Sequence, residues 1–377
     1  MTHLLTSPAF SPSSPSFLQN FRHLRQSLPS GHCPQIQEPN TMWKKKYYEN
    51  PRRLALAAIA KETETTTPTI ASSLPHLDPA RSEKLDLQSL PPLDPSKCPR
   101  FQLADRPGLT YGTTARVLNQ DSFDAAIAMP SSVLGISHSA AGEILGHLKS
   151  VAGAPEHLTT ATAARVAVLN MASERSPGGG WLKGASAQEE ALCFRSTLAA
   201  SLHRNLYPIQ QRAGLYTRDV VVFRASMSDG HKLMIPETPT SNLPVVSALS
   251  VAGIRQPDVK PLGQDAGPVA SGSAKAPKGP FVFADPAARG LTKDKMRLCL
   301  RMAGAKGHTM LVLGAIGCGA FRNPPGEVVK CWQEVLTEAE FAGGWFKEIW
   351  FAVYDRRNEG NFEIFSEAFD GKSVCVL

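Results

Sequence analysis

The chain contains short apolar runs separated by polar or glycine-rich turns, a pattern that predicts buried strands alternating with helices. Val220, Val221 and Val222 predict a strand covered on both faces, because they leave no polar position for an exposed face. Further strands or strand–turn–helix units are expected at residues 115–128, 166–202, 243–251, 310–329 and 345–354, and helices at residues 52–65, 139–151, 291–304 and 361–369. This order of elements predicts an α/β fold.

Three segments do not follow this pattern. Residues 1–41 are rich in Ser and Pro and contain one acid, Glu38, so they cannot bury enough apolar surface to fold. They resemble a mitochondrial transit segment, although a disordered extension, or translation that starts at Met42, is the simpler interpretation. Residues 66–99 resemble a linker or a segment that wraps over the surface, and residues 257–278, rich in Pro, Gly, Ala and Ser, resemble a flexible insertion. We therefore predict three parts: a 1–41 extension or targeting segment, a 42–99 helix and linker packed on the core, and a 100–377 core domain.

The composition narrows the class of protein. Hydrophobic residues at 42% and charged residues at 19% describe an ordinary soluble chain, and no apolar run approaches the length of a membrane span. A net charge of +7 suits a polyanionic partner, but a solvated basic surface explains it as well. Lys44–Lys46 could be a nuclear signal or the solvated start of a helix. The seven cysteines are dispersed without metal-binding spacing, which argues against a zinc site and for a reducing compartment.

The most informative stretch is residues 166–202, where an apolar strand leads into a glycine-rich loop and then a helix. The loop contains Gly178, Gly179 and Gly180, which let a backbone approach a ligand closely and adopt positive φ without steric cost. Gln188, Glu189 and Glu190 begin the helix, where backbone N–H groups and the helix dipole favour negative charge. One loop thus offers a bare main chain and a carboxyl group to a sugar or phosphorylated ligand.

A second stretch, residues 310–329, repeats the strand–loop–helix arrangement. Glycines in its turn suggest that backbone N–H groups bind a diphosphate. Arg322 occupies the position where a dinucleotide fingerprint needs its third glycine, and no P-loop Gly-Lys-Ser/Thr follows. The segment is therefore neither a Rossmann fingerprint nor a P-loop. Phe321 could be a core aromatic beneath the loop or a contact for a ligand.

The glycine triplet, the seven residues after it and Gln188-Glu189-Glu190 resemble the signature of the bacterial-type, or microbial-type, poly(ADP-ribose) glycohydrolases. Residues 317–321 resemble the diphosphate loop of the same family, and the resemblance covers roughly residues 115–368. It implies a macrodomain-like three-layer fold, with a mixed central sheet between helices and an N-terminal helical or irregular extension. It also implies hydrolysis of ribose–ribose O-glycosidic bonds to release ADP-ribose.

The resemblance assigns roles to residues. Glu190 is expected to be the general acid that protonates the leaving ribose oxygen and then activates water. Glu189 belongs to the catalytic pair, and we expect it to position substrate hydroxyls, because adjacent helical residues do not face each other. Without the rest of the motif, both acids would be explained as complements of the helix dipole. The expected substrate-binding residues are Asn170, Gly178, Gly179, Gly180, Gln188, Gly317, Cys318, Gly319, Ala320 and Phe321.

Some residues have two interpretations. Asp121 follows a strand and could contact adenine or cap a helix, and capping is favoured. Tyr354 could stack on adenine or simply pack. Cys193 and Cys318 have no His nearby in the sequence, so we interpret them as buried thiols rather than nucleophiles.

Three functions remain open: a chain-cleaving glycohydrolase, a non-catalytic ADP-ribose reader, and a hydrolase of single ADP-ribosyl adducts. Intact Glu189 and Glu190 favour an enzyme over a reader. We expect no metal and no redox cofactor. The expected partners are poly(ADP-ribose) or ADP-ribosylated protein as substrate and ADP-ribose as product, with no membrane, for a monomer. We expect nuclear or cytoplasmic location, with mitochondria as the alternative that residues 1–41 raise.

Overall fold

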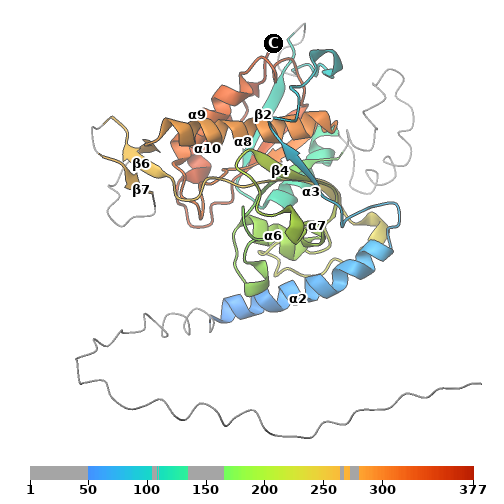
Figure 1. Cartoon of the computed structure of the whole chain (residues 1–377). Helices are drawn as coiled ribbons and strands as arrows, with labels where there is room; N and C mark the ends of the chain where they lie inside the picture. Colours follow the sequence, from blue (N-terminus) through green and yellow to red (C-terminus); the bar gives the residue numbers. More distant parts are fainter. Residues whose placement is uncertain (1–49, 104–107, 109, 135–164, 264–266, 272–279) are drawn as a thin grey trace, which may run out of the picture. The chain divides into compact units, whose positions relative to one another are not determined.

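The structure, a computed structural model, describes residues 50–103, 108, 110–134, 165–263, 267–271 and 280–377. Figure 1 shows a central sheet with helices on both sides. The helix expected at residues 139–151 lies outside the described residues. In the part of the chain that the structure describes, no helix combines the length and the apolar character needed to cross a membrane.

Within the described residues, the main sheet has eight strands in the order β1-β4-β5-β3-β9-β10-β2-β11. The five central strands are parallel, and the pairings at both edges are antiparallel. The carboxyl ends of the five parallel strands therefore lie at the same edge of the sheet. In open α/β sheets, the loops at this edge bind ligands. The strands are β1 (Glu83–Asp86), β2 (Thr113–Leu118), β3 (Ala167–Met171), β4 (Ala213–Val221), β5 (Val245–Val251), β9 (Met310–Leu313), β10 (Glu348–Ala352) and β11 (Ser373–Val374).

The sheet is buried on both faces. Leu311 and Leu313 of β9 pack in one hydrophobic cluster, whereas Met310 and Val312 pack in the other, as alternate side chains of a strand must. The first cluster contains residues of α8 (Pro286–Ala305), α9 (Pro325–Leu336) and α10 (Asn361–Phe369). The second contains residues of α2 (Pro51–Ser72), α3 (Ser122–Leu134), α6 (Gln188–Arg195) and α7 (Leu198–Ser201). The three-layer α/β fold expected from the resemblance is confirmed (Figure 1).

Local signals explain where the helices begin. Asn50 accepts a hydrogen bond from the backbone N–H of Arg52 and precedes a proline at the first position of α2. Asp285 caps α8 in the same way, before Pro286. Asp121 accepts a bond of 2.8 Å from the N–H of Phe123, so its interpretation as the cap of α3 is confirmed.

Two expectations about irregular segments were wrong in part. Residues 83–86, expected in a linker, form the edge strand β1, because they pair with Ala213–Tyr216. The proposed insertion at 257–278 contains β6 (Asp258–Pro261) and β7 (Val269–Ala270), which form a small sheet with β8 (Phe281–Phe283). In β6, exposed and buried positions alternate, with Val259 buried. The Pro and Gly content concealed this short alternation.

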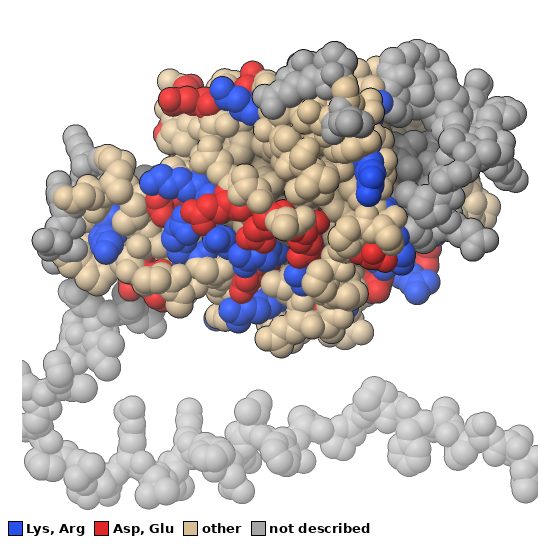
Figure 2. All heavy atoms as spheres, turned by 90° about the horizontal axis from the view of Figure 1, so that it is seen from above, with Lys and Arg blue, Asp and Glu red and all other residues tan. Residues whose placement is uncertain are grey.

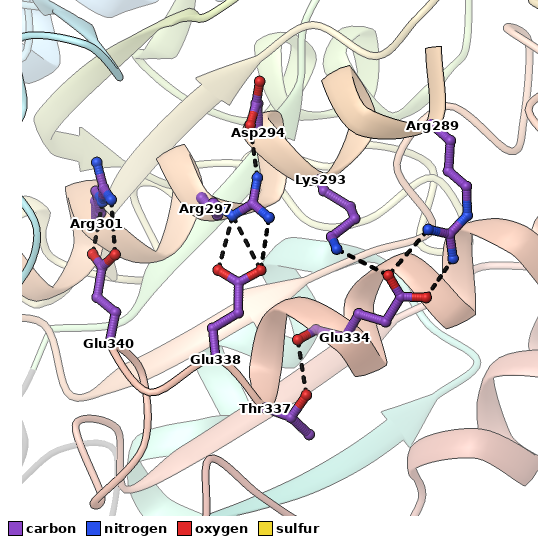
Figure 3. A network of polar contacts seen from close by, with 9 residues as sticks. All are labelled: Arg289, Lys293, Asp294, Arg297, Arg301, Glu334, Thr337, Glu338 and Glu340. Carbon is purple, nitrogen blue, oxygen red and sulfur yellow. Dashed lines mark hydrogen bonds and ion pairs between the residues drawn. The ribbon is translucent and has the colours of Figure 1, made fainter. Parts of the chain in front are cut away.

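Helices α8 and α9 are joined at the surface by a row of ion pairs (Figure 3). Arg289 and Lys293 of α8 both contact Glu334 of α9. Arg297 and Arg301 extend the row to two acids beyond the end of α9, Glu338 and Glu340. On the face drawn in Figure 2, basic and acidic side chains are intermixed rather than separated into patches. Much of the charge on this face is therefore paired locally.

Candidate active site

The glycine loop after β3 folds back against the start of α6. Gly178 and Gly179 have φ of +65° and +60°, a left-handed conformation that costs other residues energy. At Gly179, an added Cβ would lie 2.5 Å from Oε1 of Glu190 and 3.0 Å from Oε2 of Glu189. Glycine is therefore required here twice, for its backbone conformation and because the loop passes directly over both acids.

Glu190 is fixed by main-chain donors. Its Oε1 accepts a bond of 2.9 Å from the N–H of Gly180, and its Oε2 accepts one of 3.0 Å from the N–H of Ala187. The second bond satisfies an N–H at the helix start, as in half of a capping box. The carboxyl group is mostly buried, at 8% exposed, and is held between the glycine loop and α6. The orientation of Glu190 thus depends on the loop.

Glu189 lies in a different environment from its neighbour. Its Oε2 accepts a bond of 2.7 Å from the N–H of Ser173, but its buried Oε1 has no partner among the described residues. Burial, with a smaller contribution from the charge of Glu190, raises the pKa of Glu189 to about 8. Glu189 therefore retains its proton at neutral pH, and the pair of acids carries a proton that could be used in catalysis.

Two further polar atoms beside Glu189 have no partner in the described part of the chain. Asn170, at the end of β3, donates from Nδ2 to Oγ of Ser250 at 3.0 Å, but its buried Oδ1 is unpaired. The hydroxyl group of Tyr207 is also buried and has no partner among the described residues. Burial raises the pKa of Tyr207, and the nearby Glu189 and Cys193 raise it further. Unpaired buried polar atoms are rare and costly, so together with Oε1 of Glu189 they suit the hydroxyl groups of a bound sugar.

Tyr207 did not emerge from the sequence. It lies 17 residues beyond Glu190, outside the motif, and no spacing points to it. The structure brings it close because the N–H of Ile209 donates to the carbonyl of Glu174 at 2.8 Å, which ties this segment to the glycine loop. The position of Tyr207 beside Glu189 therefore depends on a tertiary contact that the sequence does not reveal.

Gln188 connects the strand to the helix. Its Oε1 accepts from the N–H of Met171 at 2.9 Å, and its Nε2 donates to the carbonyl of Leu169 and to Oγ of Ser122. These bonds fix α6 against the end of β3. Both N–H groups of its amide are therefore used within the protein. Its expected contact with substrate stays a prediction.

The second glycine loop lies at the same edge of the sheet, after β9. Gly317 has φ of +78°, and an added Cβ there would lie 2.5 Å from Nδ2 of Asn323. That nitrogen donates to the carbonyl groups of Ile254, at 2.6 Å, and Gly317, at 3.1 Å, so this loop is joined to the loop after β5. Phe321 is half-buried, and the guanidinium group of Arg255 lies 6.0 Å from its ring centre.

The residues expected in this second loop have different surroundings. Gly319 and Ala320 are exposed, and an added Cβ at Gly319 would contact nothing within 4 Å. Cys318 and, on α6, Cys193 are buried thiols whose pKa values burial raises, which agrees with the interpretation that neither is a nucleophile. The backbone at Gly319 and Ala320 is exposed, and the hydrogen bonds of Asn323 hold the end of this turn. Such a turn is suited to bind a diphosphate through its backbone N–H groups.

The arrangement has the elements of an acid-catalysed cleavage. One carboxyl is held by main-chain N–H groups, its neighbour holds a proton, and unpaired polar atoms lie beside them. A glycoside needs protonation of its leaving oxygen, which a positioned carboxylic acid supplies.

The comparisons with known proteins agree with this description. Residues 44–226 match the family model described as microbial-type PARG, catalytic domain, a range that includes the glycine triplet and both acids but not residues 310–329. A search of curated proteins found no match.

Solved structures show a similar fold. A poly(ADP-ribose) glycohydrolase from Thermomonospora curvata is 22% identical, with a TM-score of 0.52, and the match covers 83% of this chain and 99% of that one. A second structure of that protein, bound to the inhibitor ADP-HPD, gives the same values. A poly(ADP-ribose) glycohydrolase from Deinococcus radiodurans in complex with ADP-ribose is 23% identical, with a TM-score of 0.50, and covers 76% of this chain and 93% of that one.

Proposed function

We propose that this chain, whose residues 44–226 match the microbial-type poly(ADP-ribose) glycohydrolase catalytic domain, hydrolyses poly(ADP-ribose) to ADP-ribose. The enzyme class is a glycosidase. In this proposal Glu190 is the general acid, Glu189 and Asn170 bind ribose hydroxyl groups, and the loop at residues 317–321 binds the diphosphate. ADP-ribose and the inhibitor ADP-HPD, bound in the similar bacterial structures, support this choice of ligand.

The chemistry follows from the surroundings of the two acids. The bond between ribose units breaks through an oxocarbenium-like transition state, in which negative charge develops on the leaving oxygen. Glu190 donates a proton to that oxygen, and its carboxylate then takes a proton from the attacking water. Glu189, neutral near pH 7, can donate a hydrogen bond to substrate through the oxygen that lacks a partner among the described residues. The glycine loop holds Glu190 in place by main-chain bonds.

The observation that carries the proposal is the buried carboxyl of Glu190, clamped between the N–H groups of Gly180 and Ala187, directly beneath Gly179. A carboxyl that only complemented the helix dipole would be solvated and would not need a glycine loop folded over it. The placement therefore favours a catalytic acid over a simple helix cap.

The test uses three ligands with purified full-length protein. Automodified poly(ADP-ribosyl)ated protein, a singly ADP-ribosylated peptide and free ADP-ribose are each incubated with it, and released ADP-ribose or binding is measured. Release of ADP-ribose from chains is the expected result. Tight ADP-ribose binding with no release from either substrate would instead identify a reader, and release from the single adduct alone would identify an adduct hydrolase.

A further inference from the structure

Two exposed arginines converge beside the candidate active site. Nη2 of Arg52, in the first turn of α2, lies 3.0 Å from Sδ of Met227, and Nη1 of Arg356 lies 3.3 Å from the same sulfur. The two guanidinium groups therefore share one thioether, although α2 and the loop after β10 are far apart in the sequence. Two like charges brought this close repel each other unless something neutralises them.

The protein groups around them do not neutralise this charge. A thioether sulfur is only a weak acceptor, and no acidic residue in the described part of the chain forms an ion pair with either arginine. Three arginines of α8 differ: Arg289, Arg297 and Arg301 are each paired with glutamates (Figure 3). The pair at Met227 thus lacks the local compensation that the α8 arginines have.

Arg356 is also oriented by an aromatic ring. Its guanidinium group lies 5.9 Å from the ring centre of Tyr354, which is 45% exposed. Contacts with Tyr354 and Met227 restrict this side chain on two sides, so that its remaining donors face solvent. A guanidinium group held in this way is suited to bind a phosphate, because its donors form a planar fork.

The turn of α2 that contains Arg52 contacts the glycine loop that holds Glu190 in place. Gly180 donates to Glu190, and the short helix after it (Trp181–Lys183) ends at a carbonyl that accepts a bond of 2.9 Å from Nη2 of Arg53. At Gly184, an added Cβ would lie 2.1 Å from the carbonyl oxygen of Arg53, so α2 begins in direct contact with this loop. Arg52 is the preceding residue of the same helical turn.

We propose that Arg52 and Arg356 form a phosphate subsite for the ADP-ribose unit on the leaving side of the scissile bond. The inference rests on the proposed function, because only a chain substrate has a diphosphate there. We expect free ADP-ribose to bind without contacting this subsite, and a single adduct on a protein has no phosphate on that side. The subsite thus gives the enzyme a preference for chains that the acid alone does not supply.

The test compares the double variant Arg52→Gln/Arg356→Gln with the control Lys61→Gln/Arg81→Gln, which removes two exposed positive charges elsewhere. For chains, KM of the double variant should rise roughly tenfold and its salt dependence should weaken, since fewer phosphate contacts release fewer counterions. Its kcat and its Kd for free ADP-ribose should stay at the wild-type values. The control should match the wild type in all four quantities.

Three outcomes would overturn the subsite: an unchanged KM, an equal rise in the control, or an equal loss of affinity for ADP-ribose monomer, which would place the arginines in the product cleft. Chain affinity is also measured directly by fluorescence polarisation with labelled poly(ADP-ribose). A wild type that binds chains without releasing ADP-ribose would contradict the glycohydrolase while leaving the subsite testable by affinity.

Discussion

At the scale of single residues, Glu189 and Glu190 are adjacent in the sequence, but their carboxyl oxygens have different hydrogen-bond partners. Glu190 has a main-chain donor on each oxygen, whereas Glu189 has one donor and one buried oxygen without a partner in the described chain. The sequence motif identifies both acids, but not this difference, because it depends on the path of the glycine loop. Tyr207 could not be predicted for the same reason: a tertiary contact brings it to Glu189.

Replacement of Glu189 by Gln should change how stability depends on pH. The folded-state pKa of about 8 lies above the ordinary 4.5, so the folded state binds an extra proton between these values. Stability of the wild type should therefore fall as pH rises from about 4.5 to about 8, by something on the order of 3–5 kcal/mol from this group. Glu189→Gln should remove that part of the decline, which Tm measurements at pH 5 and pH 8 would detect. Parallel Tm curves for the two proteins would contradict the raised pKa.

Replacement of Gly179 by Ala should impair catalysis more than folding. The added Cβ would meet Oε1 of Glu190 at 2.5 Å and move the acid, and displacement by about 1 Å can cost on the order of 100-fold in rate. Gly371→Ala is the matched control, because Gly371 has a similar φ of +67° but an added Cβ meets nothing within 4 Å. Both variants should lose similar stability in chemical denaturation, and only Gly179→Ala should lose kcat. Equal activity in the two would exclude a role for the close approach.

At the scale of elements, most positions could be predicted and most boundaries could not. The helix at 361–369 was predicted with the bounds that α10 has, because its aromatic residues recur at helical spacing. The helix at 52–65 extends to Ser72, through Pro68, because Thr63, Thr67 and Ile70 are buried. Tertiary burial outweighed the poor helix propensity of the threonines. Strand β1 was missed because four residues at a sheet edge show little alternation.

The ion pairs between α8 and α9 should stabilise the protein mainly above acidic pH. Arg289 and Lys293 hold the pKa of Glu334 near about 2, below its ordinary 4.5, so this stability is present above about pH 4.5 and is lost as pH falls toward 2. Glu334 is partly exposed, so solvent screening limits the effect to roughly 1 kcal/mol or less. Glu334→Gln should lower Tm at pH 6, less at pH 3, and not at all in 1 M KCl. A Tm difference that is independent of salt and pH would rule out this electrostatic origin.

At the scale of the whole molecule, α2 is an integral part of the fold rather than an appendage. Leu56 and Ala60 join the cluster that contains α6, and Oγ1 of Thr63 donates to the carbonyl of Phe194 at 2.8 Å. The same oxygen accepts from Nε of the buried Arg224 at 2.9 Å. The sequence predicted this helix, but only the structure shows that its first turn contacts the glycine loop. The predicted division at residue 99 remains a prediction.

Replacement of Thr63 by Val should destabilise the molecule by about 1–3 kcal/mol, because it leaves the charged Nε of Arg224 buried without its acceptor. Thr65→Val is the control, since Thr65 is exposed and bonds only to Glu62 of its own helix. Urea denaturation of the two variants measures the difference in the free energy of unfolding. A Thr63→Val protein as stable as the control would mean that α2 contributes little to the fold through this contact.

The measurement that most directly tests the central claim is ADP-ribose release from poly(ADP-ribose) by Glu190→Gln, with the Kd for ADP-ribose determined on the same sample. We predict that release slows by about 10²–10⁴-fold, because a general acid contributes about that much and Gln cannot supply its proton. The Kd for ADP-ribose should change little. A Glu190→Gln protein that releases ADP-ribose at the wild-type rate, while Glu189→Gln does not, would transfer the acid role to Glu189 and contradict the account.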